Sequence, residues 1–311
     1  MIMKKFLVYL LHNRDLLKIA ILTRIAHIVP DKLYLKLLYQ LKTGYKLNID
    51  NPQTFNEKLQ WLKLYNRKPE YTQMVDKNDA KRYVANMIGE KYIIPTLGVW
   101  DRFEDIDFDL LPNQFVLKTT HGGGNTGVVI CKDKSKLDID KARTKLNRSL
   151  KQCIYKNLKE WPYKNVQKRI IAEVLLQEEK TPSNPNGDLI DYKFYCFNGE
   201  AKVVLIASDR HLDTGVCFDY FDKEFNHYPF EQGGPNSQKR IEKPAFLDEM
   251  WQLANKLSEG IPHVRVDLYC VNGNIYFGEL TFFDSSGFAE FKPREWDYKF
   301  GEWITLPKIR C

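Results

Sequence analysis

Long apolar segments are missing from this 311-residue sequence. Its two most apolar stretches, FLVYLL at residues 6–11 and IAILTRIAHIV at residues 19–29, are too short or too interrupted by charge to cross a bilayer. No secretory cleavage pattern follows a long enough apolar core. We therefore expect neither a membrane-spanning segment nor a secreted protein.

Closely spaced cysteines are missing as well. There is no C-x-x-C motif, and most of the six cysteines lie singly in apolar, strand-like runs. Disulfide frameworks are typical of small secreted chains, and zinc sites commonly use cysteine pairs. The pattern predicts a cytoplasmic protein whose cysteines are reduced thiols. They are Cys131, Cys153, Cys196, Cys217, Cys270 and Cys311.

Repeats and low-complexity tracts are also absent, and the composition is that of a folded protein, with 43% hydrophobic and 13% aromatic residues. The length allows two packed domains. Helical spacing of apolar residues predicts helices at 54–65, 77–88 and 245–259. Short strands are expected at 115–119, 128–131, 170–176, 192–197 and 202–207, with a hairpin turn at Asn198-Gly199. Helices that alternate with antiparallel hairpins indicate an α+β protein.

Positive charge is concentrated at the start of the chain. Residues 1–50 contain nine lysines and arginines but only three aspartates, which accounts for most of the net charge of +7. This basic, amphipathic helical region is consistent with docking on an anionic membrane surface or an acidic partner. The alternative is that its helices pack on the main body with their lysines in solvent. No basic-aromatic module indicates nucleic-acid binding.

One predicted hairpin brings together opposite charges. Apolar and polar residues alternate from 264 to 271, so Arg265 and Asp267 point the same way, and Glu279 and Thr281 share a face of the following strand. A two-residue Asn-Gly turn would separate the carboxylates. We predict a three-residue turn that includes Asn274, which sets Asp267 opposite Glu279. Opposed carboxylates favour a divalent cation, although scattered surface charges are the alternative.

A glycine-rich turn lies between two predicted strands, in FVLKTTHGGGNTGVVI at 115–130. Consecutive glycines let backbone N–H groups approach an anion, and Lys118 adds a positive charge. This is not a Walker A loop, because no Gly-Lys-Ser/Thr follows and the next element is a strand. A phosphate site and a plain surface turn are both consistent with the loop alone.

The order of five motifs is more specific. They are DKNDAKRYV, QFVLKTTHGGGNTGVVICKD, IIAEVLLQE, DYKFYCFNGEAKVV and VRVDLYCVNGNIYFGELTFFDSSG. Together they resemble the ATP-grasp superfamily, in particular the TupA-like subgroup associated with teichuronopeptide and other bacterial surface polysaccharides. The last motif is also similar to that of D-alanine:D-alanine ligases. The resemblance covers roughly residues 50–290 and implies two α+β subdomains that clasp ATP between antiparallel sheets, after a helical, basic N-terminal region.

The resemblance implies a role for each matched residue. Lys118 and Lys193 would bracket the phosphates of ATP, and Asp191 would contact the ribose or orient Lys193. The strand edge at Glu173, Val174 and Leu175 would bind adenine. The flexible lid would consist of His121, Gly122, Gly123, Gly124 and Asn125.

The residues that the resemblance implies for binding metal and substrate lie in the last motif. Asp267 and Glu279 would hold Mg²⁺, and Arg265 would neutralise the carboxylate under attack. Thr281 stands where many members have a metal-binding asparagine, and Lys81 stands where an arginine is expected. We expect His263 to be structural. The implied domains are 1–72 (helical region), 73–112 (first part of the fold), 113–175 (glycine-rich lid) and 176–311 (metal-binding subdomain).

The implied activity is an ATP- and Mg²⁺-dependent carboxylate-amine ligase in bacterial surface polysaccharide (capsule, O-antigen or teichuronopeptide) biosynthesis. One substrate would be a uronic acid or sugar-linked carboxylate, and the other an amino acid or amino sugar. The protein would be cytoplasmic, and peripheral association with the inner face of the membrane is a further expectation. A sugar kinase on the same fold, a glycosyltransferase of the same pathway and an inactive scaffold are the alternatives.

Overall fold

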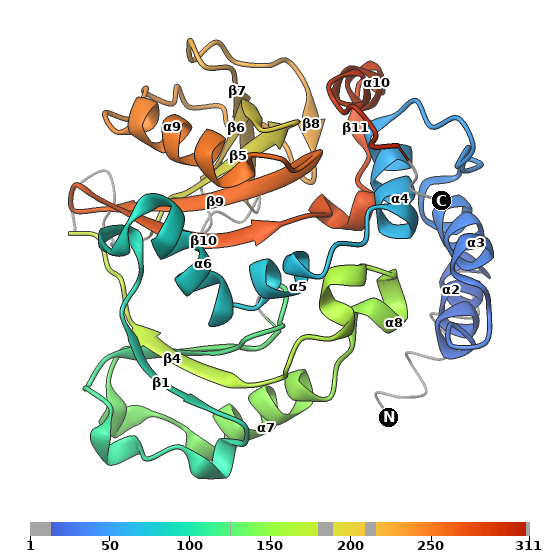
Figure 1. The fold of residues 1–311 in the computed structure, drawn as a ribbon. Coiled ribbons are helices and arrows are strands. Elements are labelled where there is room, and N and C mark those ends of the chain that lie inside the picture. Colours follow the sequence, from blue (N-terminus) through green and yellow to red (C-terminus); the bar gives the residue numbers. More distant parts are fainter. Residues whose placement is uncertain (1–13, 125, 180–188, 209–215, 309–311) are drawn as a thin grey trace.

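The computed structural model describes residues 14–124, 126–179, 189–208 and 216–308. Two antiparallel sheets dominate it, and helices lie around and beside them (Figure 1). The α+β class predicted from the sequence is confirmed.

The smaller sheet has four strands in the order β1-β4-β2-β3. Each pair of neighbours is antiparallel, and helix α7 packs against β2 and β3. The strands and this helix are β1 (Thr96–Trp100), β2 (Phe115–Thr119), β3 (Val128–Cys131), β4 (Ile170–Val174) and α7 (Ile139–Leu150).

The larger sheet has five strands in the order β10-β9-β5-β6-β7, and α9 packs against β5, β6 and β9. Its elements are β5 (Asp191–Phe197), β6 (Glu200–Ser208), β7 (Cys217–Phe221), β9 (His263–Val271), β10 (Asn274–Thr281) and α9 (Leu247–Ser258). A separate pair of short strands, β8 (Glu231–Gln232) and β11 (Phe291–Lys292), lies near α10 (Glu295–Glu302).

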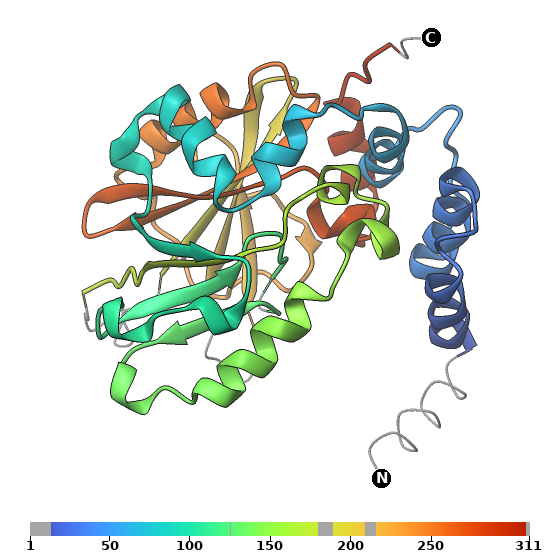
Figure 2. The same cartoon turned by 60° about the horizontal axis from the view of Figure 1, so that its bottom comes forward.

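Helices precede the sheets in the chain. They are α2 (Arg14–Arg24), α3 (Asp31–Thr43), α4 (Phe55–Tyr65), α5 (Glu70–Val75) and α6 (Asp79–Ile88), and the short α8 (Ile154–Leu158) follows α7. Helices α2 and α3 lie side by side at one edge of the molecule in both views (Figures 1 and 2). In the described ranges, no helix is long and apolar enough to cross a membrane.

Local sequence signals explain several boundaries. Helix α4 begins with a capping box, in which Thr54 accepts from the backbone of Glu57 and the Glu57 side chain accepts from the backbone of Thr54. The predicted turn at Asn198-Gly199 is confirmed, because both residues have the positive φ of a two-residue hairpin turn.

Four predicted boundaries were wrong by two residues: those expected at 77, 176, 202 and 245 lie at 79, 174, 200 and 247. The helix expected from Lys77 begins at Asp79, because the Asp76 side chain accepts hydrogen bonds from the backbone N–H groups of Asn78 and Asp79 and so caps the chain there. The strand expected to reach residue 176 ends at Val174, where the backbone leaves the paired ladder.

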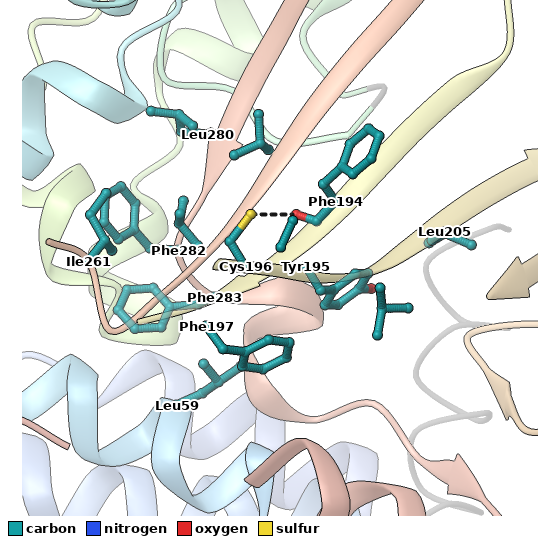
Figure 3. Close-up of a cluster of buried hydrophobic side chains, with 14 of the residues drawn as sticks. Leu59, Phe194, Tyr195, Cys196, Phe197, Leu205, Ile261, Leu280, Phe282 and Phe283 are labelled. Carbon is teal, nitrogen blue, oxygen red and sulfur yellow. Dashed lines mark hydrogen bonds between the residues drawn. The ribbon is translucent and has the colours of Figure 1, made fainter. Parts of the chain in front are cut away.

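The molecule has two separate hydrophobic cores. The smaller core lies between the four-stranded sheet and α7, and includes Phe115 and Leu146. The larger core joins the N-terminal helices to the five-stranded sheet, α9 and α10. Figure 3 shows part of it, where Leu59 of α4 lies near aromatic residues of β5 and the segment after β10. The predicted domain boundaries stay predictions.

Candidate active site

The hairpin of β9 and β10 places the charged residues as predicted. Asp267 pairs with Glu279, and Arg265 pairs with Thr281. Residues directly opposite one another in an antiparallel pair have neighbouring side chains. The predicted register is therefore confirmed at these four residues.

The predicted three-residue turn was wrong, although the predicted pairing of Asp267 with Glu279 is correct. Val271 pairs with Asn274, so the turn has two residues, and both Asn272 (φ 48°) and Gly273 (φ 80°) have the positive φ of such turns. The register instead shifts between Phe277 and Glu279, where Gly278 is an extra residue in β10. A bulge of this kind moves the following side chains to the other face of the strand.

Arg265 is held by two carboxylates. Its Nε and Nη2 atoms donate to the two oxygens of Asp267 at 2.7 and 2.8 Å, and its Nη1 atom donates to Asp284. Nη2 also lies 3.3 Å from the Thr281 hydroxyl. Burial by itself lowers the pKa of Arg265, but Asp267 and Asp284 outweigh burial and raise it well above its usual value. The guanidinium is therefore charged and fixed in orientation.

Lys193 approaches the same carboxylate from β5. It pairs in register with Asp267 and donates to the Asp267 Oδ2 atom at 2.6 Å, and its Nζ atom lies 3.5 Å from Asp191. Asp267 is 2% exposed. Both of its oxygens thus face cations beneath the surface of the site.

Glu279 is more accessible, with a side chain that is 35% exposed. Its Oε2 atom accepts from Lys77 at 3.0 Å, and Lys77 also donates to the backbone oxygen of Gly122 at 2.8 Å. Burial alone would raise the pKa of Glu279, but Lys77, Arg265 and Lys193 outweigh it and lower the pKa to about 2. Lys77 therefore connects the glycine-rich turn of one sheet to a carboxylate of the other.

A second charged cluster lies on the smaller sheet. Glu173 of β4 lies between Lys118 of β2 and Lys81 of α6, at 2.6 and 2.5 Å. Burial raises the pKa of Glu173, but the two ammonium groups outweigh burial and lower it. The carboxylate is ionised and fixes both lysines in place.

The strand edge expected to bind adenine, at Glu173, Val174 and Leu175, is not open at Glu173. Glu173 pairs with Thr96 on one side and with Val116 on the other, because β4 is an inner strand. The Val174 N–H donates to the oxygen of Pro95 at 3.1 Å. The chain leaves the sheet only after Val174, at Leu175.

The glycine-rich turn follows β2. His121 is buried, and its Nε2 atom lies 3.2 Å from the oxygen of Ser149. Burial and the nearby Lys168 lower the pKa of His121, so the ring is neutral. Gly124 has a positive φ of 57°, and Asn125 lies outside the described residues.

Some of these groups line a pocket of about 470 Å³ whose wall comes from both sheets. Arg265, Asp267, Asp284 and His121 are not among its lining residues. One part of its wall is aliphatic, and the other part is charged. The aliphatic wall includes Ile94, Val116, Ile130, Val174, Leu175, Leu176 and Leu189. The charged wall includes Lys77, Lys118, Glu173, Asp191, Lys193 and Glu279. Aliphatic side chains and lysines in one pocket suit a ligand with a flat ring and a chain of phosphates.

The donor set fits a magnesium ion that keeps water and phosphate ligands. Mg²⁺ typically takes one or two protein carboxylates and completes its shell with water and phosphate oxygens. Asp267 and Glu279 are the two carboxylates available, opposite one another in register. Glu279 borders the pocket, whereas both oxygens of Asp267 accept from Arg265 and one of them also accepts from Lys193. No cluster of three or more His, Cys, Asp or Glu side chains that could hold a metal occurs among the described residues. A site made by protein ligands alone is thus not seen there.

Three contributors to the site were missed or left open by the sequence. Lys77 belongs to a recognised motif but had no assigned role, and Lys81 was left uncertain. Asp284, which holds Arg265, follows the hairpin in the motif FFDSSG.

Gly278, inside the second strand of the hairpin, was the available sequence signal for the bulge, because strand glycines often mark one. His263 is buried against Phe55, as expected of a structural residue.

Comparison with known proteins gives one family match. The model of a family described as TupA-like ATP-grasp matches residues 57–305. No curated protein matches the chain.

Several solved structures are similar to part of this chain. D-alanine–D-alanine ligase from Bacillus anthracis, complexed with ATP, is 17% identical (TM-score 0.40), and the match covers 67% of this chain and 55% of that one. The corresponding ligase from Helicobacter pylori is 13% identical (TM-score 0.42), with 82% and 70% covered. The ATP-grasp ligase PsnB, complexed with a minimal precursor, Mg and ADP, is 14% identical (TM-score 0.39), with 73% and 57% covered. This chain thus spans little more than half of the first of these proteins.

Proposed function

The chain belongs to the TupA-like ATP-grasp family, and we propose that it is an ATP- and Mg²⁺-dependent ligase that joins a carboxylate to an amine. Family membership confirms the superfamily and fold predicted from the motif order. In the proposed reaction, a carboxylate oxygen attacks the γ-phosphorus of ATP and ADP leaves. The amine then attacks the acyl carbon of the acylphosphate, and phosphate and a proton are released.

One observation supports this proposal above the others. Lysines from two different sheets, Lys118 and Lys193, line the same pocket as Glu279. Phosphoryl transfer depends mainly on positioning and on charge stabilisation, so an enzyme of this class needs fixed cations around the phosphates. Glu173 and Asp267 fix these two lysines by ion pairs of 2.6 Å each.

The proposed roles of the remaining residues depend on their places in the wall of the pocket. Adenine would lie against the aliphatic wall, near Val174 and Leu175 at the end of β4. The glycine-rich turn at Gly122, Gly123 and Gly124 would cover the phosphates. Asp267, Glu279 and the Thr281 hydroxyl would hold Mg²⁺, which when bound would offset the negative charge of the phosphate oxygens.

Arg265 would bind the carboxylate that is phosphorylated. Asp267 and Asp284 orient its guanidinium, and Thr281 is the residue opposite it in β10. A fixed guanidinium can stabilise negative charge that develops on the acyl group without reorganising. No side-chain nucleophile is required in this scheme.

The substrate class follows from the subgroup that the motifs resemble. We propose a uronic acid or another sugar-linked carboxylate of a bacterial surface polysaccharide as one substrate. An amino acid or amino sugar would be the other. A protein of this kind would act in the cytoplasm, where ATP and activated sugar precursors are present.

Mass spectrometry of reaction products tests the proposal. The protein is incubated with ATP, Mg²⁺ and a panel of uronic acids paired with amino acids or amino sugars. A ligase forms an amide together with ADP and phosphate. A phosphorylated sugar would identify a kinase instead, consumption of a nucleotide sugar would identify a glycosyltransferase, and no turnover with any pair would contradict the proposed activity.

A further inference from the structure

One face of the N-terminal helices has an unusual concentration of exposed aliphatic side chains. Half of the twelve large hydrophobic residues that are exposed in the described parts of the chain lie between residues 21 and 45. Ile21 lies on α2, and Ile25 and Ile28 lie in the turn that follows it; the three are 54%, 38% and 69% exposed, and the Ile25 N–H donates to the oxygen of Ile21 at 3.3 Å. On α3, Leu33 and Leu37 are one turn apart and are 51% and 42% exposed. We call these five residues the apolar face.

The apolar face is presented by helices that are fixed to the body. The other side of α3 is buried at Tyr34, Leu35, Leu38 and Tyr39. Asp31 accepts from Arg67 at 2.8 Å and from Tyr155 at 3.0 Å, and it pairs with Lys159 at 3.1 Å. The expectation that these helices pack on the main body is thus confirmed for α3. It does not explain the apolar face, whose five side chains stay exposed.

Basic residues accompany the apolar face. Lys18 and Arg24 are exposed on α2, and Lys32 is exposed on α3. Lys18 pairs with Asp15 at 3.0 Å and Lys32 pairs with Asp50 at 2.8 Å, both at exposed positions. A hollow beside the two helices is lined by Ile21, Ile25 and Leu37 together with the Lys18 and Asp15 pair. Aliphatic side chains flanked by lysine and arginine are typical of surfaces that insert into the headgroup region of anionic bilayers.

We propose that the apolar face docks the protein on the surface of an anionic lipid bilayer. The aliphatic side chains would enter the boundary between headgroups and acyl chains, and Lys18, Arg24 and Lys32 would contact lipid phosphates. The helices lie in the plane of the surface in this arrangement and do not cross it. Charge complementarity favours this occupant, since the apolar face has basic neighbours. The inference does not depend on the proposed ligase activity.

Co-sedimentation with vesicles tests the proposal. The full chain is mixed with phosphatidylcholine vesicles that contain roughly 30 mol% phosphatidylglycerol or none. We expect binding to the anionic vesicles, and the double variant Ile25→Glu/Leu37→Glu should bind them at least about tenfold more weakly. Lys18→Glu/Arg24→Glu should weaken binding and reduce its dependence on salt concentration.

Leu110→Glu is the matched control, because Leu110 is 83% exposed but lies beside the smaller sheet. It should bind vesicles like the unaltered protein, and circular dichroism should show that every variant is folded. Equal binding of the double variant and the unaltered protein would overturn the proposal. So would the absence of binding, or a dimer in light scattering that only Ile25→Glu/Leu37→Glu dissociates, which would identify a second copy as the occupant.

Discussion

Asp267 and Glu279 are opposite one another in register but differ in their surroundings. Asp267 is buried and bonded to Arg265 and Lys193, whereas Glu279 borders the pocket. Removing one partner of a buried ion pair leaves the other charge uncompensated, which typically costs about 3–5 kcal/mol. Asp267 therefore contributes to the stability of the hairpin as well as to the proposed metal site, and Glu279 contributes mainly to the latter.

We predict that Glu279→Gln lowers Mg²⁺-dependent ATP turnover by about 100-fold or more, with little change in melting temperature. Asp267→Asn should lower both turnover and melting temperature, because Arg265 and Lys193 lose their carboxylate. Steady-state ADP release and thermal unfolding measure the two effects. Glu290→Gln, at an exposed carboxylate outside the pocket, is the control. Normal turnover in Glu279→Gln would contradict the proposed metal site.

His263 should make the stability of the protein depend on pH. It is buried against Phe55, its Nδ1–H donates to the oxygen of Cys196 at 2.9 Å, and burial lowers its pKa from 6.5 to about 4. The unfolded chain therefore takes up a proton below pH 6.5 that the folded chain does not accept until pH 4. Stability should fall through this range by on the order of 1.4 kcal/mol per pH unit.

Urea unfolding at several pH values measures this dependence. His263→Phe keeps an aromatic ring at the site but removes the proton uptake, so its unfolding free energy should fall less between pH 6.5 and pH 4. His27→Gln, at an exposed position, should behave like the unaltered protein. Identical pH profiles for His263→Phe and the unaltered protein would show that His263 does not cause the effect.

At the scale of secondary-structure elements, the β9–β10 hairpin depends on one glycine. A Cβ atom at Gly278 would lie 2.9 Å from the Tyr269 ring and 3.0 Å from the backbone oxygen of Asp267. Real side chains do not tolerate such contacts without movement. The absence of a side chain therefore allows the extra residue to fit beside the strand that bears Asp267.

Gly278→Ala should destabilise the protein by about 1–3 kcal/mol, as expected for overpacking against backbone. It should also weaken ATP binding, because any shift of the bulge moves Glu279. Gly123→Ala is the control for stability, since its nearest contact would be 3.9 Å away, and its effect should be within about 0.5 kcal/mol. Urea midpoints without ligand compare the two variants. Equal midpoints for both would contradict the packing argument.

The elements differ in how well the sequence predicts them. Short apolar runs define β2 and β3, and the spacing of Phe55 and Leu59 defines α4, since in each case the pattern within the segment decides its structure. The turn and bulge of the β9–β10 hairpin were not predicted correctly, because a strand glycine is compatible with several registers. The contact of Lys81 with Glu173 was not predicted either, since it depends on how α6 packs beside the smaller sheet.

At the scale of the whole molecule, the site spans two hydrophobic cores. Lys118 belongs to the sheet of the smaller core and Lys193 to that of the larger core. Lys77 links them through Gly122 and Glu279. A ligand that contacts both lysines binds the assembled arrangement only, so it should stabilise the smaller core against local opening.

Leu146→Ala tests this coupling. Leu146 is fully buried in the smaller core, and truncation of a buried leucine typically costs about 2–5 kcal/mol. Hydrogen exchange should speed up in β1 to β4 while β5, β6 and β9 stay protected, and ATP with Mg²⁺ should restore part of the protection. Leu257→Ala, in the larger core, should instead speed up exchange in the five-stranded sheet. Uniform loss of protection in both variants would show that the cores unfold as one unit.

The bulge at Gly278 also sets a counting rule for this hairpin. A two-residue turn pairs positions whose numbers differ by an odd amount, as 271 and 274 do, but positions 267 and 279 differ by an even amount. One unpaired residue changes the parity, and a turn of odd length would do the same. A chain that lacks position 278 should therefore keep both carboxylates together in a regular hairpin. In a sequence with the same two-residue turn, an even difference between the two carboxylate positions therefore indicates that a bulge is needed to bring the carboxylates together.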